Sequence, residues 1–245
     1  MGANKVKYGL KNVHYALVTE TVVTTGADAG KTVSSYGAVK ALAGAVSLSM
    51  SSTASKNVFR ADDSNYYVSY GEGGYEGDLE VARVNEDFLK DVLGYQEDDD
   101  KILVESSAAF KGATYFALTF EFDGDQRATK HCLYKCSASR PDIASQTTGE
   151  NGAVDPQTET LTLTAVPRVD EDKYIHLQTQ ETTSSAVIDA WYTAVPVPTF
   201  TCSSPLYSFI KKTRASAKSS TKRNSRNGEP VPQTVTSGTL FSFAS

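Results

Sequence analysis

Cysteine is scarce in this 245-residue sequence, which has three: Cys132, Cys136 and Cys202. On one β-strand the first two would stand roughly 13 Å apart, which is too far for a disulfide bond. Their spacing also differs from that of a zinc knuckle. We therefore expect neither a disulfide-stabilised scaffold nor a structural zinc site, and this cysteine usage is typical of a protein in a reducing compartment.

Long hydrophobic runs are missing as well. No stretch of roughly 18 apolar residues occurs, so we expect no insertion into a membrane. The first five residues lack the apolar segment of a signal peptide. Hydrophobic residues nevertheless make up 40% of the chain, which is enough to build a core and argues against global disorder.

Blocks of strong helix formers are few, whereas Ser, Thr, β-branched and aromatic residues are abundant. Such residues suit the pleated surface of a sheet. Apolar and polar residues alternate through 46–50 and again through 160–165, as expected for half-buried strands. The pattern predicts strands at 4–17, 46–50, 66–70, 77–84, 115–122, 129–137 and 160–165, with a turn at 123–125 that joins two of them into a hairpin.

Two short helices are expected beside these strands. Asn85 is a typical N-cap and Gly94 a typical helix end, and one face between them is apolar: Phe88, Leu89, Val92 and Leu93. A weaker pattern of the same kind runs through 186–194. The chain is therefore predicted to be mainly β, with one flanking helix and a short C-terminal helix.

Charge is distributed unevenly. Residues 1–198 contain 17 Lys and Arg against 28 Asp and Glu, whereas residues 199–245 contain seven and one. This shift predicts a boundary between an acidic domain, 1–198, and a basic, Ser-rich extension, 199–245. The contact candidates of the extension are Lys211, Lys212, Arg214, Lys222, Arg223 and Arg226. Three roles stay open for it: a solvated tail, a segment docked on a neighbouring acidic subunit, and a contact to nucleic acid or a cell surface.

Catalytic motifs are absent or incomplete. The stretch 26–32 is similar to a phosphate-binding P-loop but has three residues between its glycines where that loop has four. His14, His131 and His176 lie singly in strand-like stretches, and no G-x-S-x-G elbow occurs. Acidic residues gather at predicted turns, where solvated carboxylates are ordinary. We therefore expect no enzyme, no cofactor and no metal site.

Tyrosines crowd the Gly-rich stretch 65–77: Tyr66, Tyr67, Tyr70 and Tyr75. Stacking on nucleic-acid bases favours basic residues between the aromatic ones, and this stretch carries acidic residues instead. Tyrosine is common at protein–protein contacts. The cluster therefore indicates a protein interface.

Several blocks share their order and spacing with a known family. They are KYGLKNVHYA (7–16), GAVSLS (44–49), GYEGDLE (74–80) with DFLKDVLG (87–94), and FEFDGD (120–125) continuing through Tyr134, Cys136 and SRP (139–141) to TETLT (158–162). In this respect the chain resembles the major tail proteins of long-tailed bacteriophages, in the group named after phage phi13. The resemblance covers about residues 5–195. It implies a β-sandwich that closes toward a barrel, flanked by a helix at 85–93.

Members of this family form hexameric rings that stack into the tube through which DNA leaves the virion. The resemblance thus implies several partners: further copies of the chain, tape-measure and tail-terminator proteins, and double-stranded DNA in transit without specific binding. It also implies assembly in the bacterial host cytoplasm and a final place in the virion tail. An acidic lining repels phosphates, and the negative charge of residues 1–198 fits such a conduit.

Loop residues supply the interface and lumen candidates. The loop 24–40, which in relatives reaches neighbouring subunits, and the tyrosine cluster give the interface candidates Thr25, Gly26, Asp28, Gly30, Lys31, Tyr66, Tyr67, Tyr70 and Tyr75. The acidic lumen candidates are Asp62, Asp63, Asp98, Asp99, Asp123 and Asp125. The alternative functions are a β-sandwich module that recognises a glycan or receptor, a single-ring head–tail connector, and an NTPase built on 26–32.

Overall fold

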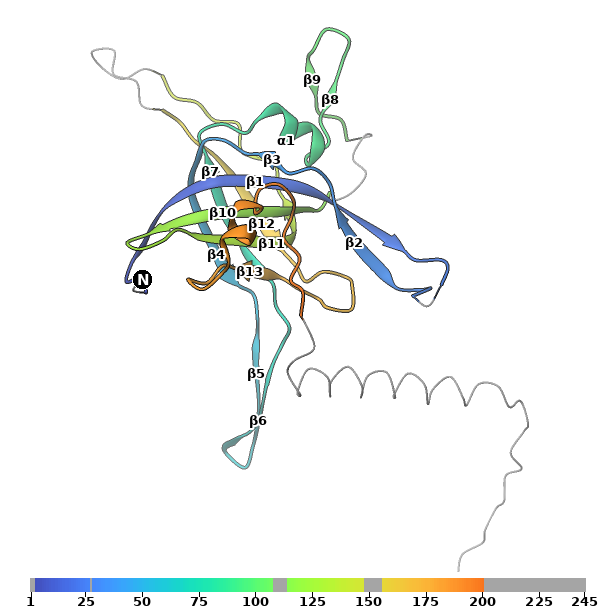
Figure 1. Ribbon diagram of the computed structural model, residues 1–245, viewed down its shortest axis with the longest axis vertical. Helices are drawn as coiled ribbons and strands as arrows, with labels where there is room; N and C mark the ends of the chain where they lie inside the picture. The colour runs from blue at the N-terminus through green and yellow to red at the C-terminus, as the bar shows by residue number, and fades with distance from the viewer. Residues whose placement is uncertain (1–2, 27, 108–113, 148–155, 201–245) are drawn as a thin grey trace, which may run out of the picture. The chain divides into compact units, whose positions relative to one another are not determined.

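The computed structural model describes residues 3–26, 28–107, 114–147 and 156–200 (Figure 1). The chain divides into two units, Met1–Pro196 and Val197–Ser245. The six contact candidates of the basic extension lie outside the described residues.

The strands are β1 (Lys7–Val22), β2 (Thr32–Tyr36), β3 (Lys40–Ala41), β4 (Ala45–Ser52), β5 (Lys56–Ala61), β6 (Ser64–Tyr70), β7 (Tyr75–Val81), β8 (Gln96–Glu97), β9 (Leu103–Val104), β10 (Phe116–Gly124), β11 (Thr129–Ala138), β12 (Glu159–Ala165) and β13 (His176–Gln178). The helices are α1 (Glu86–Asp91) and α2 (Ser185–Asp189).

Nine strands form one antiparallel sheet in the order β2-β1-β10-β11-β12-β7-β4, with β3 also paired to β1 and β13 to β11. β5 and β6 form a separate two-stranded ribbon, and so do β8 and β9. The prediction of a mainly β chain with two short helices is confirmed. The predicted strands are all present, although β1 runs on to Val22 and β7 ends at Val81 rather than at residue 84.

The sheet does not close into a barrel within the described residues. The link from β3 to β4 passes beside β1, where the Leu42 amide donates to the Val13 carbonyl at 2.8 Å. No strand pairing joins β4 to β1 in the part of the chain that the structure describes. The sheet therefore keeps open edges in the described residues: β2 and β4 at the two ends of the main strand order, and the short strands β3 and β13 beside β1 and β11.

One face of the sheet carries the larger hydrophobic core. Leu79 and Val81 of β7 and Leu161 and Leu163 of β12 alternate onto this face and are fully buried. α1 adds Phe88, which is also fully buried. Burying a side chain of this size contributes about 1.5–3 kcal/mol relative to leaving it exposed. The alternation seen in the sequence thus places the apolar residues of these strands on the face of the sheet that is buried in the core.

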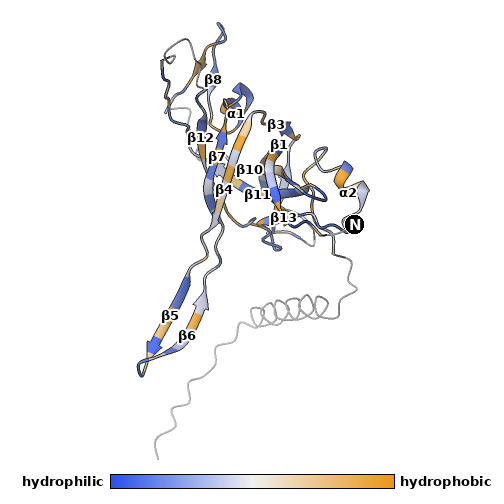
Figure 2. Cartoon of the chain, turned by 90° about the vertical axis from the view of Figure 1, so that its left-hand side faces the viewer, coloured by the Kyte–Doolittle hydropathy of each residue, from blue (hydrophilic) through white to orange (hydrophobic). Residues whose placement is uncertain are grey.

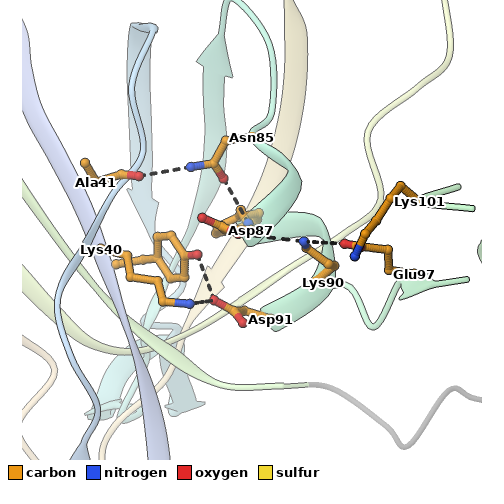
Figure 3. Close-up of polar contacts among 10 residues, drawn as sticks. Lys40, Ala41, Asn85, Asp87, Lys90, Asp91, Glu97 and Lys101 are labelled. Atoms are coloured by element: carbon orange, nitrogen blue, oxygen red, sulfur yellow. Dashed lines mark hydrogen bonds and ion pairs between the residues drawn. The ribbon is translucent and has the colours of Figure 1, made fainter. Parts of the chain in front are cut away.

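Helix α1 covers this core because its ends are defined locally. The Asn85 side chain accepts a hydrogen bond from the Phe88 amide at 2.9 Å. Gly94 has a φ of 77°, which glycine adopts readily just after a helix end. The Asn85 side chain also donates to the Ala41 carbonyl at 3.0 Å (Figure 3). The predicted N-cap is confirmed, and the helix ends at Asp91, two residues before the predicted end at 93.

The opposite face is covered in part, over β1, β10 and β11. Trp191, which is 2% exposed, packs there against Ala117, Cys132 and Tyr134. α2 precedes this tryptophan and is shorter than the predicted 186–194. Neither helix in the described part of the chain has the length and apolar character needed to cross a membrane.

A register irregularity in β11 separates two of the cysteines. Between the pairs Phe116–Cys136 and Leu118–Leu133, β11 contains one residue more than β10. Cys132 consequently lies in the core on one face of the sheet and Cys136 in the core on the other. Both thiols are free, and burial raises the pKa of Cys136 to about 12. The prediction that these two form no disulfide is confirmed.

Candidate assembly interface

The β5–β6 ribbon extends away from the sheet (Figure 2). It continues β4 and β7, which pair with each other up to Ser52 and Tyr75. At its tip, Asp62 and Asp63 have φ values of 51° and 57°, as the type I′ turn of a two-residue hairpin requires. The sequence NVFR-ADDS-NYYVSY therefore forms a hairpin outside the core, with one register irregularity between Phe59 and Arg60.

Large apolar side chains are exposed along this ribbon. Tyr66, Tyr67 and Tyr70 are 72%, 63% and 73% exposed, and Phe59 is 60% exposed. They occupy both faces, because Phe59 pairs with Tyr67 across the strands whereas Tyr70, three residues on, pairs with Lys56. An isolated two-stranded hairpin is marginally stable at best. A ribbon of this kind is typical of a surface that a partner covers.

Tyr75 does not belong to this exposed group. It is partly buried in β7, and its ring approaches His176 edge-on at a centroid distance of 6.1 Å. The structure thus brings three of the four tyrosine candidates together on the ribbon and places the fourth in the sheet.

The end of β1 and β2 form a second ribbon, and the P-loop-like stretch is its turn. Val18–Val22 pairs with Thr32–Tyr36, and the Gly30 amide donates to the Val23 carbonyl at 2.7 Å. Lys31 Nζ binds Asp28 at 2.5 Å and lies 3.5 Å from Glu171. The lysine that would reach a phosphate in a P-loop is therefore paired with carboxylates. The remaining candidates of this loop are exposed: Thr25, Gly26 and Gly30.

A buried arginine fixes the base of the β1–β2 ribbon. Arg168 is 7% exposed and forms an ion pair with Asp170. Its guanidinium carbon lies 5.4–5.7 Å from the ring centroids of Tyr36, Tyr134 and Tyr174. Tyr36 ends β2, so this contact holds the ribbon against the segment that follows β12. Sequence reasoning missed Arg168 because two of its ring partners, Tyr36 and Tyr134, come from distant segments.

The predicted lumen acids lie at three separate turns (Figure 1). They are Asp62 and Asp63 on β5–β6, Asp98 and Asp99 on β8–β9, and Asp123 and Asp125 on β10–β11. Three of them have partners: Asp123 pairs with Lys11, Asp125 accepts from the Lys5 amide at 2.8 Å, and Asp98 accepts from the Ile102 amide at 2.7 Å. Within one chain the six form no common surface.

Sequence reasoning also missed a row of carboxylates on the uncovered part of the sheet. Glu76, Asp78 and Glu80 alternate along β7 and share one face, roughly 7 Å apart. Hydroxyl residues flank them in register: Ser51, Ser49 and Ser47 on β4, and Thr164, Thr162 and Thr160 on β12. We call this surface the acidic ladder. The alternation of acidic and other residues through 75–81 is the signal that could have identified it.

Hydrogen bonds hold part of the acidic ladder in place. Ser47 donates to Glu80 at 2.9 Å, and Thr162 donates to Asp78 at 2.9 Å. Hydrogen bonds from Thr158 and then Ser47 lower the pKa of Glu80. These hydrogen bonds hold Glu80 in its charged form.

Charged pairs tie α1 to its neighbours (Figure 3). Asp91 accepts from Lys40 at 2.5 Å and from the Tyr15 hydroxyl at 2.9 Å. Glu97 accepts from Lys101 at 2.6 Å and from Lys90 at 2.9 Å, and these lysines lower the pKa of Glu97 to about 2. The network fixes the flanking helix to β3 and to the β8–β9 ribbon.

The histidines do not converge with other ligand types. His14 stacks on Tyr192 at a centroid distance of 4.6 Å, and His131 meets His176. Among the described residues, no group of three or more His, Cys, Asp and Glu is arranged to hold a metal ion.

Comparisons with known proteins give little further identification. No family model matches the sequence, and no curated protein matches it. One matching solved structure is the cryo-EM structure of the anti-feeding prophage baseplate, 6-fold symmetrised. The two sequences are 11% identical, the alignment covers 75% of this chain and 100% of the baseplate chain, and the TM-score is 0.34. A likeness at this level assigns neither a family nor a function.

Proposed function

We propose that the chain is a structural subunit of a phage tail, the major tail protein whose hexameric rings stack into the tube that conducts DNA. The β5–β6 ribbon carries this proposal, because it exposes four aromatic side chains over its two faces. Monomeric proteins rarely keep such a ribbon uncovered. A ring-forming subunit uses it for contact with its neighbours.

The edges of the sheet support self-assembly. In the described residues β2 and β4 each pair with one neighbouring strand, on one side only. β4 reads AVSLSMSS and contains no charged residue and no proline. Sheets of monomeric proteins commonly protect their edge strands with charged residues or proline. β4 is therefore suited to pair with a strand of another subunit.

The sequence resemblance to tail proteins concerns the elements that build the fold. Its blocks fall in β1, β4, β7, α1, β10 and β12. These elements make the sheet and its flanking helix, so the resemblance is not confined to one local motif. Tape-measure and tail-terminator proteins are then further partners, and the virion tail is the location.

The experiment that tests self-assembly is negative-stain electron microscopy at increasing protein concentration. We expect hollow six-fold rings that stack into tubes, and we expect Tyr66→Ser/Tyr70→Ser to abolish them while keeping the far-UV circular dichroism. Ile143→Ser is the matched control, because Ile143 is equally apolar, 101% exposed and outside any strand. Wild-type monomers at every concentration would refute the proposal and favour a glycan- or receptor-binding module. Single closed rings would favour a head–tail connector.

The acidic ladder supports the conduit part of the proposal. A surface that DNA passes must not bind it, and adjacent carboxylates repel phosphates. We propose that the ladder, rather than the turn acids, faces the lumen. Glu76→Lys/Asp78→Lys/Glu80→Lys should then give tubes that hold nuclease-protected DNA, with an affinity that falls steeply with salt. The same triple reversal at Asp98, Asp99 and Asp100 is the control, and equal protection in both variants would exclude the ladder as the lining.

A further inference from the structure

Two histidines from distant parts of the chain meet at the end of the larger core. Nδ1 of His131 on β11 lies 3.0 Å from Nε2 of His176 on β13. The ring planes are inclined by 15° and the centroids are 5.3 Å apart. The rings therefore lie end to end in nearly one plane, as a hydrogen bond between two ring nitrogens requires.

This hydrogen bond depends on protonation. One of the facing nitrogens must carry a hydrogen and the other a lone pair. One added proton can bind an outer nitrogen and leave the hydrogen bond intact. The cost of the added charge is largest on His131, which is half-buried, and smaller on His176, which is exposed. A second proton places two N–H groups against each other. The contact therefore holds only while at least one ring is neutral.

Aromatic rings surround the pair. His131 stacks on Phe120 with a centroid distance of 5.1 Å and an angle of 8°, and Phe122 approaches it edge-on at 5.0 Å. Tyr75 of β7 approaches His176 at 6.1 Å. These neighbours stabilise neutral rings by packing and offer no counter-charge to a cation.

The charged neighbours of the pair also favour neutral rings. From β1, Lys7 acts on His131 as a positive charge. On β10 the carboxylate of Glu121 is bound by Lys130 at 2.7 Å, and no carboxylate of the described residues acts on either ring. Burial first, then His176 and Lys7, lowers the pKa of His131 to about 4, and burial lowers the pKa of His176.

The pair lies where a short strand is held on the sheet. β13 has three residues and pairs with 131–133 of β11. The segment behind β13 leads to Trp191, which covers Cys132 and Tyr134. We propose that the His131–His176 pair is an acid-sensitive clasp, which holds β13 and the Trp191 segment on the sheet at neutral pH and releases them in mild acid. This holds whether or not the chain forms tubes.

Trp191 reports the release directly, because it is the chain's one tryptophan. Its emission is measured from neutral pH to about pH 4 at a concentration too low for assembly. We expect a red shift as the pH falls from about 6.5 toward 4, with the far-UV circular dichroism retained. For each proton that is taken up when the clasp opens, the equilibrium constant for opening rises about tenfold per unit fall in pH. A red shift that coincides with loss of the circular dichroism would be global unfolding and would overturn the proposal.

Histidine variants separate the clasp from other acid effects. His176→Phe keeps a packed aromatic ring but removes the protonation, so the acid-induced red shift should disappear. His14→Phe is the control, because His14 stacks on Tyr192 near Trp191 but takes no part in the clasp. Persistence of the red shift in His176→Phe, or its loss in His14→Phe, would overturn the proposal.

The wild-type protein provides a test that needs no variant. The Tyr134 amide donates to the Ile175 carbonyl at 3.0 Å, next to β13, whereas the Val166 amide donates to the Lys135 carbonyl at 2.9 Å on the β12 side. After correction for the intrinsic exchange rate, the hydrogen-exchange protection of Tyr134 should fall between pH 6.5 and pH 4. The protection of Val166 should not. An equal fall at both amides would refute local release.

Discussion

Replacing Arg168 with methionine should destabilise the fold strongly. Methionine fills much of the same space, but it removes the ion-pair partner of Asp170, whose side chain is 12% exposed and then keeps the hydrogen bond from the Lys173 amide at 3.2 Å. Removing one member of a buried ion pair costs about 3–5 kcal/mol. The three tyrosine rings lie 5.4–5.7 Å from the cation, near the outer limit of a cation–π contact, and together add about 1 kcal/mol.

The expected loss for Arg168→Met is therefore about 4–6 kcal/mol of unfolding free energy. In a domain of this size it corresponds to a fall in Tm of roughly 10–20 °C. Urea unfolding followed by Trp191 fluorescence measures the free energy, and calorimetry measures Tm. Tyr36 should also lose its anchor, so amide exchange along β2 should rise before global unfolding.

Two controls isolate the buried charge. Arg140 pairs with Glu105 at 2.5 Å, but the two side chains are 53% and 34% exposed, so Arg140→Met should cost about 0–1 kcal/mol. Arg168→Met/Asp170→Asn removes both charges and should recover most of the stability lost by the single variant. An Arg168→Met protein as stable as Arg140→Met, or no recovery in the double variant, would refute this account of Arg168.

Three further predictions concern β4, the β8–β9 ribbon and α1. A Cβ at Gly77 would lie 1.8 Å from the Ser49 carbonyl oxygen, so Gly77→Ala should separate β4 from β7 and expose the β4 amides to hydrogen exchange. The pKa of Glu97 is lowered to about 2, so its stabilisation of the β8–β9 ribbon is present above pH 4.5 and is lost as the pH falls toward 2, as amide exchange in β8 and β9 should show. Asp91→Asn weakens the acceptor of the Tyr15 hydroxyl and should cost about 1–3 kcal/mol in urea unfolding.

Each of these has a matched control. Gly30→Ala meets no atom within 4 Å, so its effect should be limited to about 1 kcal/mol of backbone strain from its positive φ. Lys101→Met should raise the pH at which the β8–β9 ribbon loosens, because Lys101 is the main cause of the lowered pKa of Glu97. Asp87→Asn removes only a 3.9 Å contact to Lys90 and should be close to neutral. Effects of Gly30→Ala or Asp87→Asn as large as those of Gly77→Ala or Asp91→Asn would contradict the assigned contacts, and so would an unchanged pH of loosening in Lys101→Met.

The strands and the flanking helix were predictable because local patterns determine them. The alternation through 160–165 reappears as buried Leu161 and Leu163. The hairpin formed by 115–122 and 129–137 follows from two apolar runs around a short turn, and its pairing is observed. For α1, one capping side chain and one glycine defined both ends.

The candidate sites were less predictable because they depend on contacts between distant segments. Two ring partners of Arg168 come from β2 and β11, and the two clasp histidines are 45 positions apart. The acidic lumen candidates lie at turns, where runs of acidic residues are easily recognised in the sequence. The structure places a more regular carboxylate row, Glu76 to Glu80, in the middle of a strand.

β11 shows why the face of the sheet on which a side chain lies is harder to predict than the location of the strand. On a regular strand Cys132 and Cys136 would share a face, since four residues are two full repeats of the pleat. One extra residue in β11, opposite β10, reverses the side chains beyond it, and the cysteines enter different cores. Nothing in the letters CLYKC selects that register, because leucine, tyrosine and cysteine are acceptable on either face. The choice follows from the partner strand. The facing of any residue at a subunit contact will likewise depend on the neighbouring chain.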